Sequence, residues 1–230
     1  VVVWERRLIY LSSADVRKLV SMEELIPAMS EAFIDLSAGR VLVPQRMHLE
    51  IPGKNGVELL KPAYSPQLNR TAVKVISLFQ RNPEKGLPFS HALILLLDGE
   101  TGIPMAVMEG DYLTALRTGA ASGLATRLLA RKNASVLAVF GAGFQSRTQV
   151  AAILSVRKIT KMYIIDKNKS KAQQFSEKIA SEFNMECSVP ESMEILQEVD
   201  IICTVTTADQ PVFSDAFISS GTHINAIGSF

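Results

Sequence analysis

The stretch from Val136 to Ser146, Val-Leu-Ala-Val-Phe-Gly-Ala-Gly-Phe-Gln-Ser, restricts the possible folds more than any other part of the chain. Five apolar residues followed by two closely spaced glycines predict a buried strand that turns at Gly141 and Gly143 into a helix. The first backbone N–H groups of such a helix bind anions, because they have no partner within the helix and the helix dipole favours negative charge. We therefore expect a dinucleotide pyrophosphate at this turn.

The spacing of the small residues matches the dinucleotide fingerprint G-x-G-x-x-G/A, except that its third small residue is Ser146. Serine is still small enough to let the helix approach the strand, so the departure is mild. Such a motif alone is a weak signal, and the alternative is a glycine turn that binds no nucleotide. The apolar strand before the glycines and the helix after them favour the nucleotide.

An acidic residue, Asp166, directly follows the next predicted strand. A carboxylate at this point accepts a hydrogen bond from the ribose 2′-hydroxyl, which favours NAD over NADP. Lys167 and Lys169 follow and could hold a 2′-phosphate, so NADP stays possible. This part of the chain therefore predicts the cofactor-binding residues Gly141, Gly143, Phe144, Gln145, Ser146, Asp166 and Lys167.

After Asn133 the apolar pattern alternates between strand and helix. Strands are predicted at 135–140, 161–165, 186–189, 201–205 and 222–227, and helices at 143–156, 170–183 and 190–197. This alternation predicts an α/β Rossmann fold, a doubly wound parallel sheet with right-handed crossovers. The threonines from Thr204 to Thr207 end one of these strands at the carboxyl edge, where they could line the nicotinamide ribose. They could equally be ordinary strand-end threonines.

The first half of the chain has a different pattern. A strand at 7–11 precedes two helices, which Ser12 and Ser21 cap, and Gly39 ends the second. Strands follow at 47–51, 57–63, 71–79, 89–97 and 103–108, with a hairpin turn at 52–56. The nearly continuous apolar run at 89–97 predicts a strand buried on both faces.

A long helix is predicted to join the two halves, from its cap Asp111 to about Lys132. Its apolar stripe would run from Leu113 to Leu128. The small residues from Thr118 to Gly123 predict close packing on a neighbouring element. We therefore expect two domains, an α+β domain at 1–115 and a Rossmann domain at 116–230.

Composition excludes several classes of protein. The net charge is +1, which gives no electrostatic case for nucleic acid or an anionic membrane as partner. Two distant cysteines without companion histidines argue against a disulfide framework or a metal site, and favour the cytoplasm. His48, His91 and His223 are expected to be structural or surface residues. Because the chain lacks an initial Met and ends beside a strand-like segment, we expect it to be part of a longer protein.

Several stretches together resemble the ornithine cyclodeaminase/mu-crystallin family. They are Val43-Pro-Gln-Arg46, Ala72-Val-Lys74-Val, Asp111-Tyr-Leu-Thr-Ala-Leu-Arg117-Thr-Gly-Ala120, Gly141–Ser146 and Gly221-Thr-His-Ile-Asn-Ala-Ile-Gly228. The resemblance implies a homodimer of two-domain subunits, in which the first domain binds the substrate and forms the dimer contact. It also implies an NAD(P)-dependent enzyme that acts on a small amino, imino or keto acid.

The resemblance makes Arg46, Lys74 and Arg117 the substrate-binding cations. A guanidinium can hold a carboxylate through two parallel hydrogen bonds, so Arg46 and Arg117 would form the clamp. Lys74 lies on an otherwise apolar strand, where burial would lower its pKa toward the range useful for catalytic proton transfer. The alternative is a solvated edge lysine. The resemblance further places Arg117, Thr118, Thr206 and Ile227 against the cofactor.

Two departures from the family pattern affect the expected reaction. Ornithine cyclodeaminase carries a catalytic aspartate two residues after the glycine that corresponds to Gly228, where this chain has Phe230. This counts against ornithine cyclisation. Related sequences also tend to have Thr or Ser in place of Phe89, a role that Ser90 would have to take.

We therefore expect an NAD(P)-dependent oxidoreductase that acts on the C–N bond of a small amino or imino acid. The alternatives are a cyclodeaminase that forms proline and ammonia, and a non-catalytic binding protein that depends on NAD(P)H.

Overall fold

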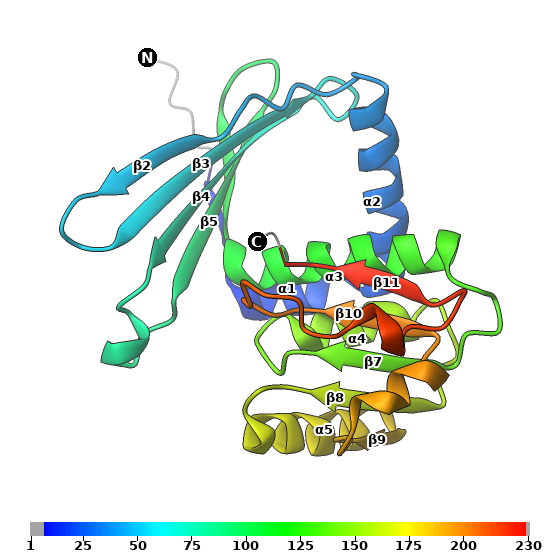
Figure 1. The fold of residues 1–230 in the computed structure, drawn as a ribbon. Helices are drawn as coiled ribbons and strands as arrows, with labels where there is room; N and C mark the ends of the chain where they lie inside the picture. Colours follow the sequence, from blue (N-terminus) through cyan, green and yellow to red (C-terminus); the bar gives the residue numbers. More distant parts are fainter. Residues whose placement is uncertain (1–6, 229–230) are drawn as a thin grey trace, which may run out of the picture. The chain divides into compact units, whose positions relative to one another are not determined.

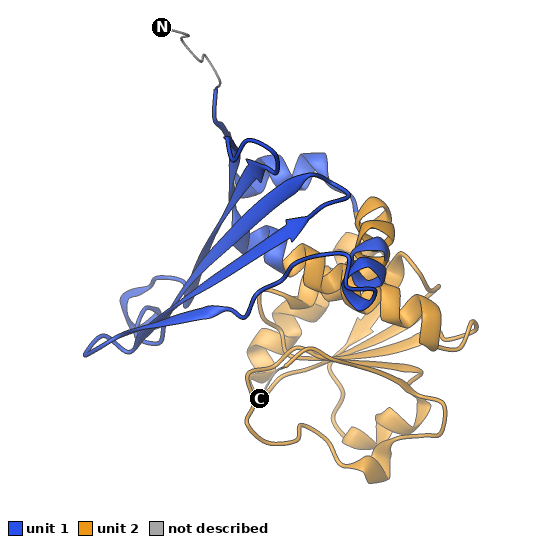
Figure 2. Cartoon of the chain, turned by 90° about the horizontal axis from the view of Figure 1, so that it is seen from above, with its two compact units in different colours: residues 1–21, 31–114 blue, residues 22–30, 115–230 orange. Residues whose placement is uncertain are grey.

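The computed structural model describes residues 7–228, so the apolar segment 1–4 and the pair Ser229–Phe230 lie outside the described residues. The chain divides into two compact units (Figure 2). Unit 1 comprises residues 1–21 and 31–114, and unit 2 comprises residues 22–30 and 115–230. Helices α2 (Met22–Ser37) and α3 (Gly110–Leu129) each contribute residues to both units. The segment 22–30, expected in the first domain, thus groups with the second.

Unit 1 contains a six-stranded sheet in the order β1-β6-β5-β4-β3-β2 (Figure 1). All neighbouring strands are antiparallel except β1 and β6, which are parallel. Its strands are β1 (Ile9–Leu11), β2 (Met47–Ile51), β3 (Gly56–Ser65), β4 (Arg70–Phe79), β5 (Ser90–Asp98) and β6 (Pro104–Glu109). The predicted strands and the 52–56 hairpin are confirmed, and the segment between β4 and β5 contains a short 3₁₀ helix, η1 (Pro83–Lys85).

Helix α1 (Ser13–Leu19) begins at the predicted cap. The Ser12 hydroxyl accepts a hydrogen bond from the Asp15 backbone N–H at 3.2 Å, and the Asp15 carboxylate accepts one from the Ser12 N–H at 3.0 Å. This reciprocal capping box satisfies two backbone donors that the helix itself cannot satisfy.

The prediction that the 89–97 strand is buried on both faces is wrong. Ala92 is 7% exposed, whereas Leu93 is 50% and Phe89 47% exposed. An antiparallel sheet can cover one face and leave the other open, and successive side chains of a strand point to opposite faces. The apolar run therefore gives this sheet an open apolar face, which also carries the exposed side chains of Met47 and Leu49.

Unit 2 contains a five-stranded parallel sheet in the order β11-β10-β7-β8-β9 (Figure 1). Its strands are β7 (Val136–Phe140), β8 (Lys161–Ile165), β9 (Glu186–Ser188), β10 (Ile201–Thr204) and β11 (His223–Ala226). Its helical segments are α4 (Ser146–Leu154), α5 (Lys169–Phe183) and the 3₁₀ turns η2 (Met193–Glu198) and η3 (Asp215–Phe217). The strand order reverses between β7 and β10, so the predicted doubly wound Rossmann fold is confirmed.

Both faces of the parallel sheet are covered by apolar packing. Leu137 and Val139 belong to one core cluster, and Ala138 and Phe140 to the other. All four are at most 2% exposed. Consecutive residues of β7 thus bury opposite faces, as its continuous apolar sequence predicts.

Helix α3 packs closely on α4 through its small residues, as expected. A Cβ atom added at Gly119 would lie 2.5 Å from the Thr148 carbonyl oxygen, and one at Gly123 would lie 3.0 Å from that of Ala152. Both distances are shorter than van der Waals contact allows. These glycines let the two helix backbones approach, which offsets their low helix propensity.

The predicted bounds of α3 are wrong at both ends. The helix begins at Gly110, so Asp111 lies in its first turn, where its carboxylate accepts a hydrogen bond from the Ala92 N–H at 3.2 Å. It ends at Leu129, and Leu128 is 69% exposed instead of closing the apolar stripe. Arg157 donates to the carbonyl oxygens of Thr126, Ala130 and Arg131 at 2.7–2.9 Å. They hold the chain where it leaves α3, and the Thr126 and Arg131 carbonyl oxygens also accept from the Ala130 and Ala134 N–H groups at 3.1 and 3.2 Å.

Two further helix predictions need correction. Helix α4 begins at Ser146 and not at Gly143, because residues 141–145 form the glycine turn. The predicted 190–197 helix is reduced to the 3₁₀ turn η2. Within residues 7–228, no helix is both long and apolar enough to cross a membrane. The same residues contain no group of three or more His, Cys, Asp or Glu side chains that could hold a metal ion.

Candidate functional site

The glycine turn requires its first glycine. Gly141 has φ 102°, and an added Cβ atom would lie 2.5 Å from the Val205 carbonyl oxygen. Residues other than glycine rarely adopt this backbone conformation, and here there is also no space for a side chain. The Gly141 N–H donates to the Ile165 carbonyl oxygen at 2.7 Å, so the turn begins directly at the carboxyl ends of the parallel strands.

Ser146, the residue that departs from the fingerprint, holds the turn together. Its hydroxyl donates to the Gly141 carbonyl oxygen at 2.7 Å and accepts from the Gly143 N–H at 3.1 Å. The side chain is fully buried. The serine therefore stabilises the turn by two hydrogen bonds that glycine or alanine would not make.

The outer side of the turn is open. A Cβ atom added at Gly143 would meet no atom within 4 Å, and Phe144 is 63% exposed. Helix α4 begins at Ser146, and the N–H groups of Ser146, Thr148 and Gln149 donate back to carbonyl oxygens of the turn at 3.1–3.2 Å. The side-chain oxygen of the half-buried Gln145 is itself buried and has no hydrogen-bond partner among the described residues. An open turn that leads into a helix N-terminus fits the pyrophosphate of a dinucleotide.

Asp166 lies at the end of β8 and contacts the glycine turn. One carboxylate oxygen accepts from the Ala142 N–H at 2.9 Å, and the other accepts from the Asn168 N–H at 2.8 Å. Each oxygen of an ionised carboxylate has a second lone pair, so the half-buried side chain can also accept from a ribose hydroxyl. Lys167 and Lys169 are exposed beside it.

A pocket lies at the carboxyl ends of β10 and β11. Its lining includes Thr204, Thr206, Phe213, Ile224, Ala226 and Gly228. The backbone holds this edge in place, because the Val205 N–H donates to Phe140 at 2.7 Å and the Ile227 N–H donates to Thr204 at 3.0 Å. The pocket is next to the point where strand order reverses, which is where open α/β sheets bind ligands.

A buried polar contact that the sequence did not predict joins β11 to α3. The Asn225 side chain is 5% exposed, and its amide donates to the Thr126 hydroxyl at 2.9 Å. Its oxygen lies 3.2 Å from His223 Nε2. Burial lowers the pKa of His223, and the contact with Asn225 partly opposes this effect. These contacts agree with the structural role expected for His223, whereas the role of Asn225 was missed because its partner is distant in sequence.

The predicted substrate cations divide between the units. Arg117 and Thr118 lie on the part of α3 that belongs to unit 2. The side chain of Arg117 has an exposed surface, yet partial desolvation lowers its pKa. A guanidinium remains charged in proteins despite such a shift.

Arg46 and Lys74 belong to unit 1 and lie on one face of its sheet. Lys74 is half-buried in the middle of β4 and pairs with Lys61 of β3. Arg46 is exposed and directly precedes β2, whose first residue, Met47, pairs with Leu60. Continuing this register places Arg46 beside Lys61. The sheet therefore brings Arg46 and Lys74 to either side of a third cation, which the sequence did not single out.

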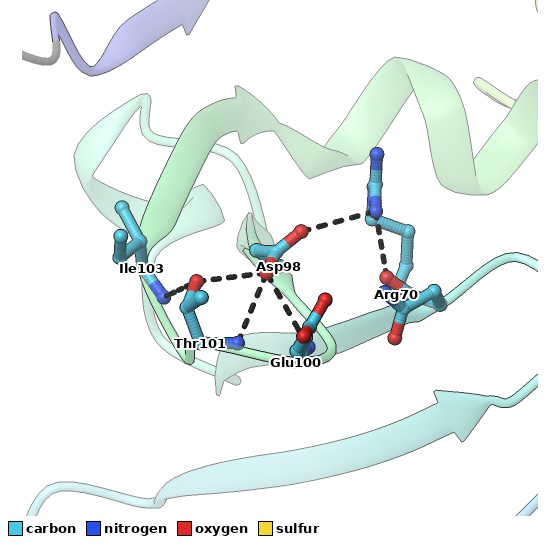
Figure 3. A network of polar contacts seen from close by, with 6 residues as sticks. Arg70, Asp98, Glu100, Thr101 and Ile103 are labelled. Carbon is cyan, nitrogen blue, oxygen red and sulfur yellow. Dashed lines mark hydrogen bonds and ion pairs between the residues drawn. The ribbon is translucent and has the colours of Figure 1, made fainter.

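At the first residue of β4, a cation is paired with a carboxylate (Figure 3). Arg70 pairs with Asp98 of β5, and its guanidinium donates to the Asp98 carboxylate at 3.3 Å. Asp98 also accepts from the Thr101 hydroxyl at 2.7 Å and from two backbone N–H groups of the following turn. These hydrogen bonds, with the largest contribution from Thr101, lower the pKa of Asp98. This cluster fixes the β5–β6 turn.

Comparison with known proteins identifies relatives over almost the whole chain. Delta(1)-pyrroline-2-carboxylate reductase of Bacillus cereus is 36% identical over 224 residues, which cover 97% of this chain and 69% of the relative. The solved structure of the Thermococcus litoralis enzyme of that name, in complex with NADH and L-proline, is 43% identical with a TM-score of 0.88. It covers 94% of this chain and 68% of that one.

An archaeal alanine dehydrogenase dimer with bound NAD is 34% identical, with a TM-score of 0.88, over 95% of this chain and 67% of that one. These relatives confirm the predicted class of enzyme, an NAD(P)-dependent oxidoreductase of imino or amino acids, and its nicotinamide cofactor. The sequence profile of one family matches residues 7–229. The chain belongs to the ornithine cyclodeaminase/mu-crystallin family.

Proposed function

We propose that this protein reduces the C=N bond of a small imino acid, with NADH as the preferred cofactor. The observation that carries the proposal is the 43% identity, over 94% of the chain, to a Delta(1)-pyrroline-2-carboxylate reductase solved with NADH and L-proline. The substrate would be a cyclic imine with a carboxylate on the carbon that accepts the hydride. The glycine turn and the cations supply the two binding functions that this reaction needs.

The chain's own residues would bind the substrate and move its proton. Arg46 and Arg117 would hold the carboxylate and so orient the neighbouring carbon, because a guanidinium recognises a carboxylate through two parallel hydrogen bonds. Lys74 would donate a proton to the imine nitrogen. NADH, when bound, supplies the hydride.

The turn at Gly141 to Ser146 would hold the pyrophosphate, and Asp166 the adenine ribose. Thr206 and Ile227, at the edge formed by β10 and β11, would face the nicotinamide half, together with Arg117 and Thr118. Thr206 lines the pocket there. Lys167 lies where it would contact a 2′-phosphate, so some use of NADPH is compatible with this site.

We also propose a homodimer formed through the open apolar face of the unit 1 sheet. Met47, Leu49 and Leu93 are 50–63% exposed on that face, which is unusual for large apolar side chains grouped on one sheet. The related archaeal alanine dehydrogenase is a dimer. The first domain, 1–115, would thus combine substrate binding with dimerisation. A cytoplasmic location, expected from the two free cysteines, is part of the same proposal.

Steady-state oxidation of NADH, measured with Delta(1)-pyrroline-2-carboxylate, tests this function. We expect L-proline as the product and a lower rate with pyruvate and ammonia. Tight NADH binding with no oxidation for any imino or keto acid would contradict the proposal and indicate a binding protein. Release of ammonia and proline from ornithine would instead indicate a cyclodeaminase.

A further inference from the structure

Strand β11 of unit 2 has different roles on its two faces. Ile224 and Ala226 line the pocket at the carboxyl ends of β10 and β11. Asn225 lies between them, is only 5% exposed and does not line that pocket. Because successive side chains of a strand point to opposite faces, Asn225 points to the other face of the sheet. It can therefore affect the pocket only through the backbone of β11.

On this other face, β10 and β11 each make a buried polar contact with a helix. The parallel register sets Asn225 beside Cys203. The Cys203 thiol donates to the Gln149 side-chain oxygen of α4 at 3.6 Å, and the Asn225 amide donates to the Thr126 hydroxyl of α3 at 2.9 Å. A thiol is a weak donor, whereas an amide is a good one. The Asn225–Thr126 bond is thus the stronger of these two attachments.

The attachment matters more for β11 than it would for a central strand. Among the described strands, β11 lies at the edge of its sheet and has a ladder only with β10. Thr126 is fully buried, so breaking its bond with Asn225 would leave a buried donor without a partner. The Asn225 oxygen lies 3.2 Å from His223 Nε2. A ring N–H donating to that oxygen orients the amide with its donor toward Thr126.

The same bond connects two parts of the site within unit 2. Helix α3 carries Arg117 and Thr118, and Thr126 lies further along it, beside β11 (Figure 1). A helix is stiff, so a contact near its C-terminal end also constrains the residues before it. The bond therefore relates the position of Arg117 and Thr118 to that of the pocket at the end of β11.

We propose that Asn225 is a positioning residue for the nicotinamide ring. Through Thr126 it holds the backbone of β11, and hence the segment 226–228, at the position where the ring binds. This inference rests on the proposed function, which places the nicotinamide half against Thr206 and Ile227. Asn225 touches neither cofactor nor substrate in this account. A shift of about 1 Å in the ring would be enough to slow hydride transfer strongly.

The test compares Thr126→Val, which removes the hydroxyl but keeps the shape, with Thr126→Ser, which keeps the hydroxyl. The probes are NADH and ADP-ribose, which lacks the nicotinamide ring, and both are titrated into the full protein. Thr126→Val should weaken NADH binding about 3- to 10-fold and change ADP-ribose binding less than about twofold. Hydride transfer to saturating Delta(1)-pyrroline-2-carboxylate, measured in a single turnover, should slow about 10- to 100-fold. Thr126→Ser should restore most of both losses.

Tyr163→Phe is the matched control. It removes another hydrogen bond of a buried side chain in unit 2, from the Tyr163 hydroxyl to the Glu198 carboxylate at 2.8 Å. It should leave both affinities and the rate of hydride transfer unchanged. If Thr126→Val does not fold, Thr126→Ala takes its place, because alanine is the residue most favourable to a helix.

Three results would overturn the inference. They are wild-type affinity of Thr126→Val for NADH, an equal loss of affinity for NADH and ADP-ribose, and failure of Thr126→Ser to restore NADH binding. An equal loss would show that the bond maintains unit 2 as a whole. The proposed function fails separately, if the wild-type protein reduces no imino acid. In that case the affinities for NADH and ADP-ribose still decide the role of Asn225.

Discussion

In the parallel sheet of unit 2, the groups arranged for a ligand are mainly backbone groups at the ends of strands. In the antiparallel sheet of unit 1, they are long cationic side chains in the middle of strands. The first arrangement depends on glycines that clear the backbone, Gly141 above all. The second depends on register, which brings Lys61 opposite Lys74. Cofactor binding should therefore be sensitive to changes of backbone shape, and substrate recognition to changes of charge.

Lys74→Met should have the largest effect on catalysis. Loss of a general acid typically lowers the rate by about 10²- to 10⁴-fold, so kcat for imine reduction should fall by that factor. NADH should still bind normally, because Lys74 lies on the unit 1 sheet. Stopped-flow measurement of hydride transfer would show the loss directly. A kcat within about threefold of wild type would remove Lys74 from the mechanism.

Gly141→Ala should be the most destabilising change in unit 2. The positive φ and the clash with the Val205 carbonyl oxygen both oppose a side chain. We expect a loss of about 2–4 kcal/mol in the free energy of unfolding, measured by urea denaturation, and loss of NADH binding. Gly143→Ala is the control: its Cβ meets no protein atom, so the fold should keep its stability while NADH binds more weakly. Equal stability of the two variants would contradict this account of the turn.

Asp166→Asn tests the choice of cofactor. The substitution keeps the shape but removes the charge that favours a ribose hydroxyl over a 2′-phosphate. The KM for NADH should rise about 10-fold or more, and the ratio of the specificity constants for NADH and NADPH should shift toward NADPH. Lys169→Met should move the ratio in the opposite direction. If the ratio of the two specificity constants does not change in Asp166→Asn, other residues determine the choice between NADH and NADPH.

Arg157→Met should affect stability without affecting the chemistry. Its guanidinium donates to three carbonyl groups at and just beyond the end of α3, so removing it should cost about 1–3 kcal/mol in the free energy of unfolding. Below the melting temperature, kcat should match wild type. Arg127→Met removes an exposed cation from α3 itself and should lower the free energy of unfolding by less. Equal melting temperatures of the two variants would contradict a stabilising role of Arg157 at the end of α3.

Asp98→Asn should have the smallest effect, and the effect should depend on pH. Hydrogen bonds lower the pKa of Asp98 in the folded state, so the carboxylate stabilises the fold above its ordinary pKa near 4. That stabilisation is lost as the pH falls through the lowered value. At neutral pH the variant should melt no more than about 4 °C below wild type, and the difference should disappear in acid. A difference that grows on acidification would have the wrong sign.

Features encoded by neighbouring residues could be predicted from the sequence. The Ser12 cap, the 52–56 hairpin, the glycine turn and the alternation of the parallel sheet each follow from residues close together in the chain. Features that depend on distant partners could not. The end of α3 depends on Arg157, Asn225 bonds to Thr126, and the openness of one face of β5 depends on what covers the sheet.

The candidate site divides in the same way. Gly141, Ser146 and Asp166 were identified from spacing, whereas Lys61 was missed. Its place opposite Lys74 appears only from the β3–β4 register, which depends on the geometry of the turn between the two strands.

The most direct test of this division of roles is a titration of NADH into the Arg46→Met/Lys74→Met double variant, followed by NADH fluorescence. The dissociation constant should stay within about twofold of wild type, while reduction of Delta(1)-pyrroline-2-carboxylate falls by at least about 10²-fold. A large loss of NADH affinity, or turnover close to that of wild type, would show that cofactor and substrate binding are not divided between the two sheets.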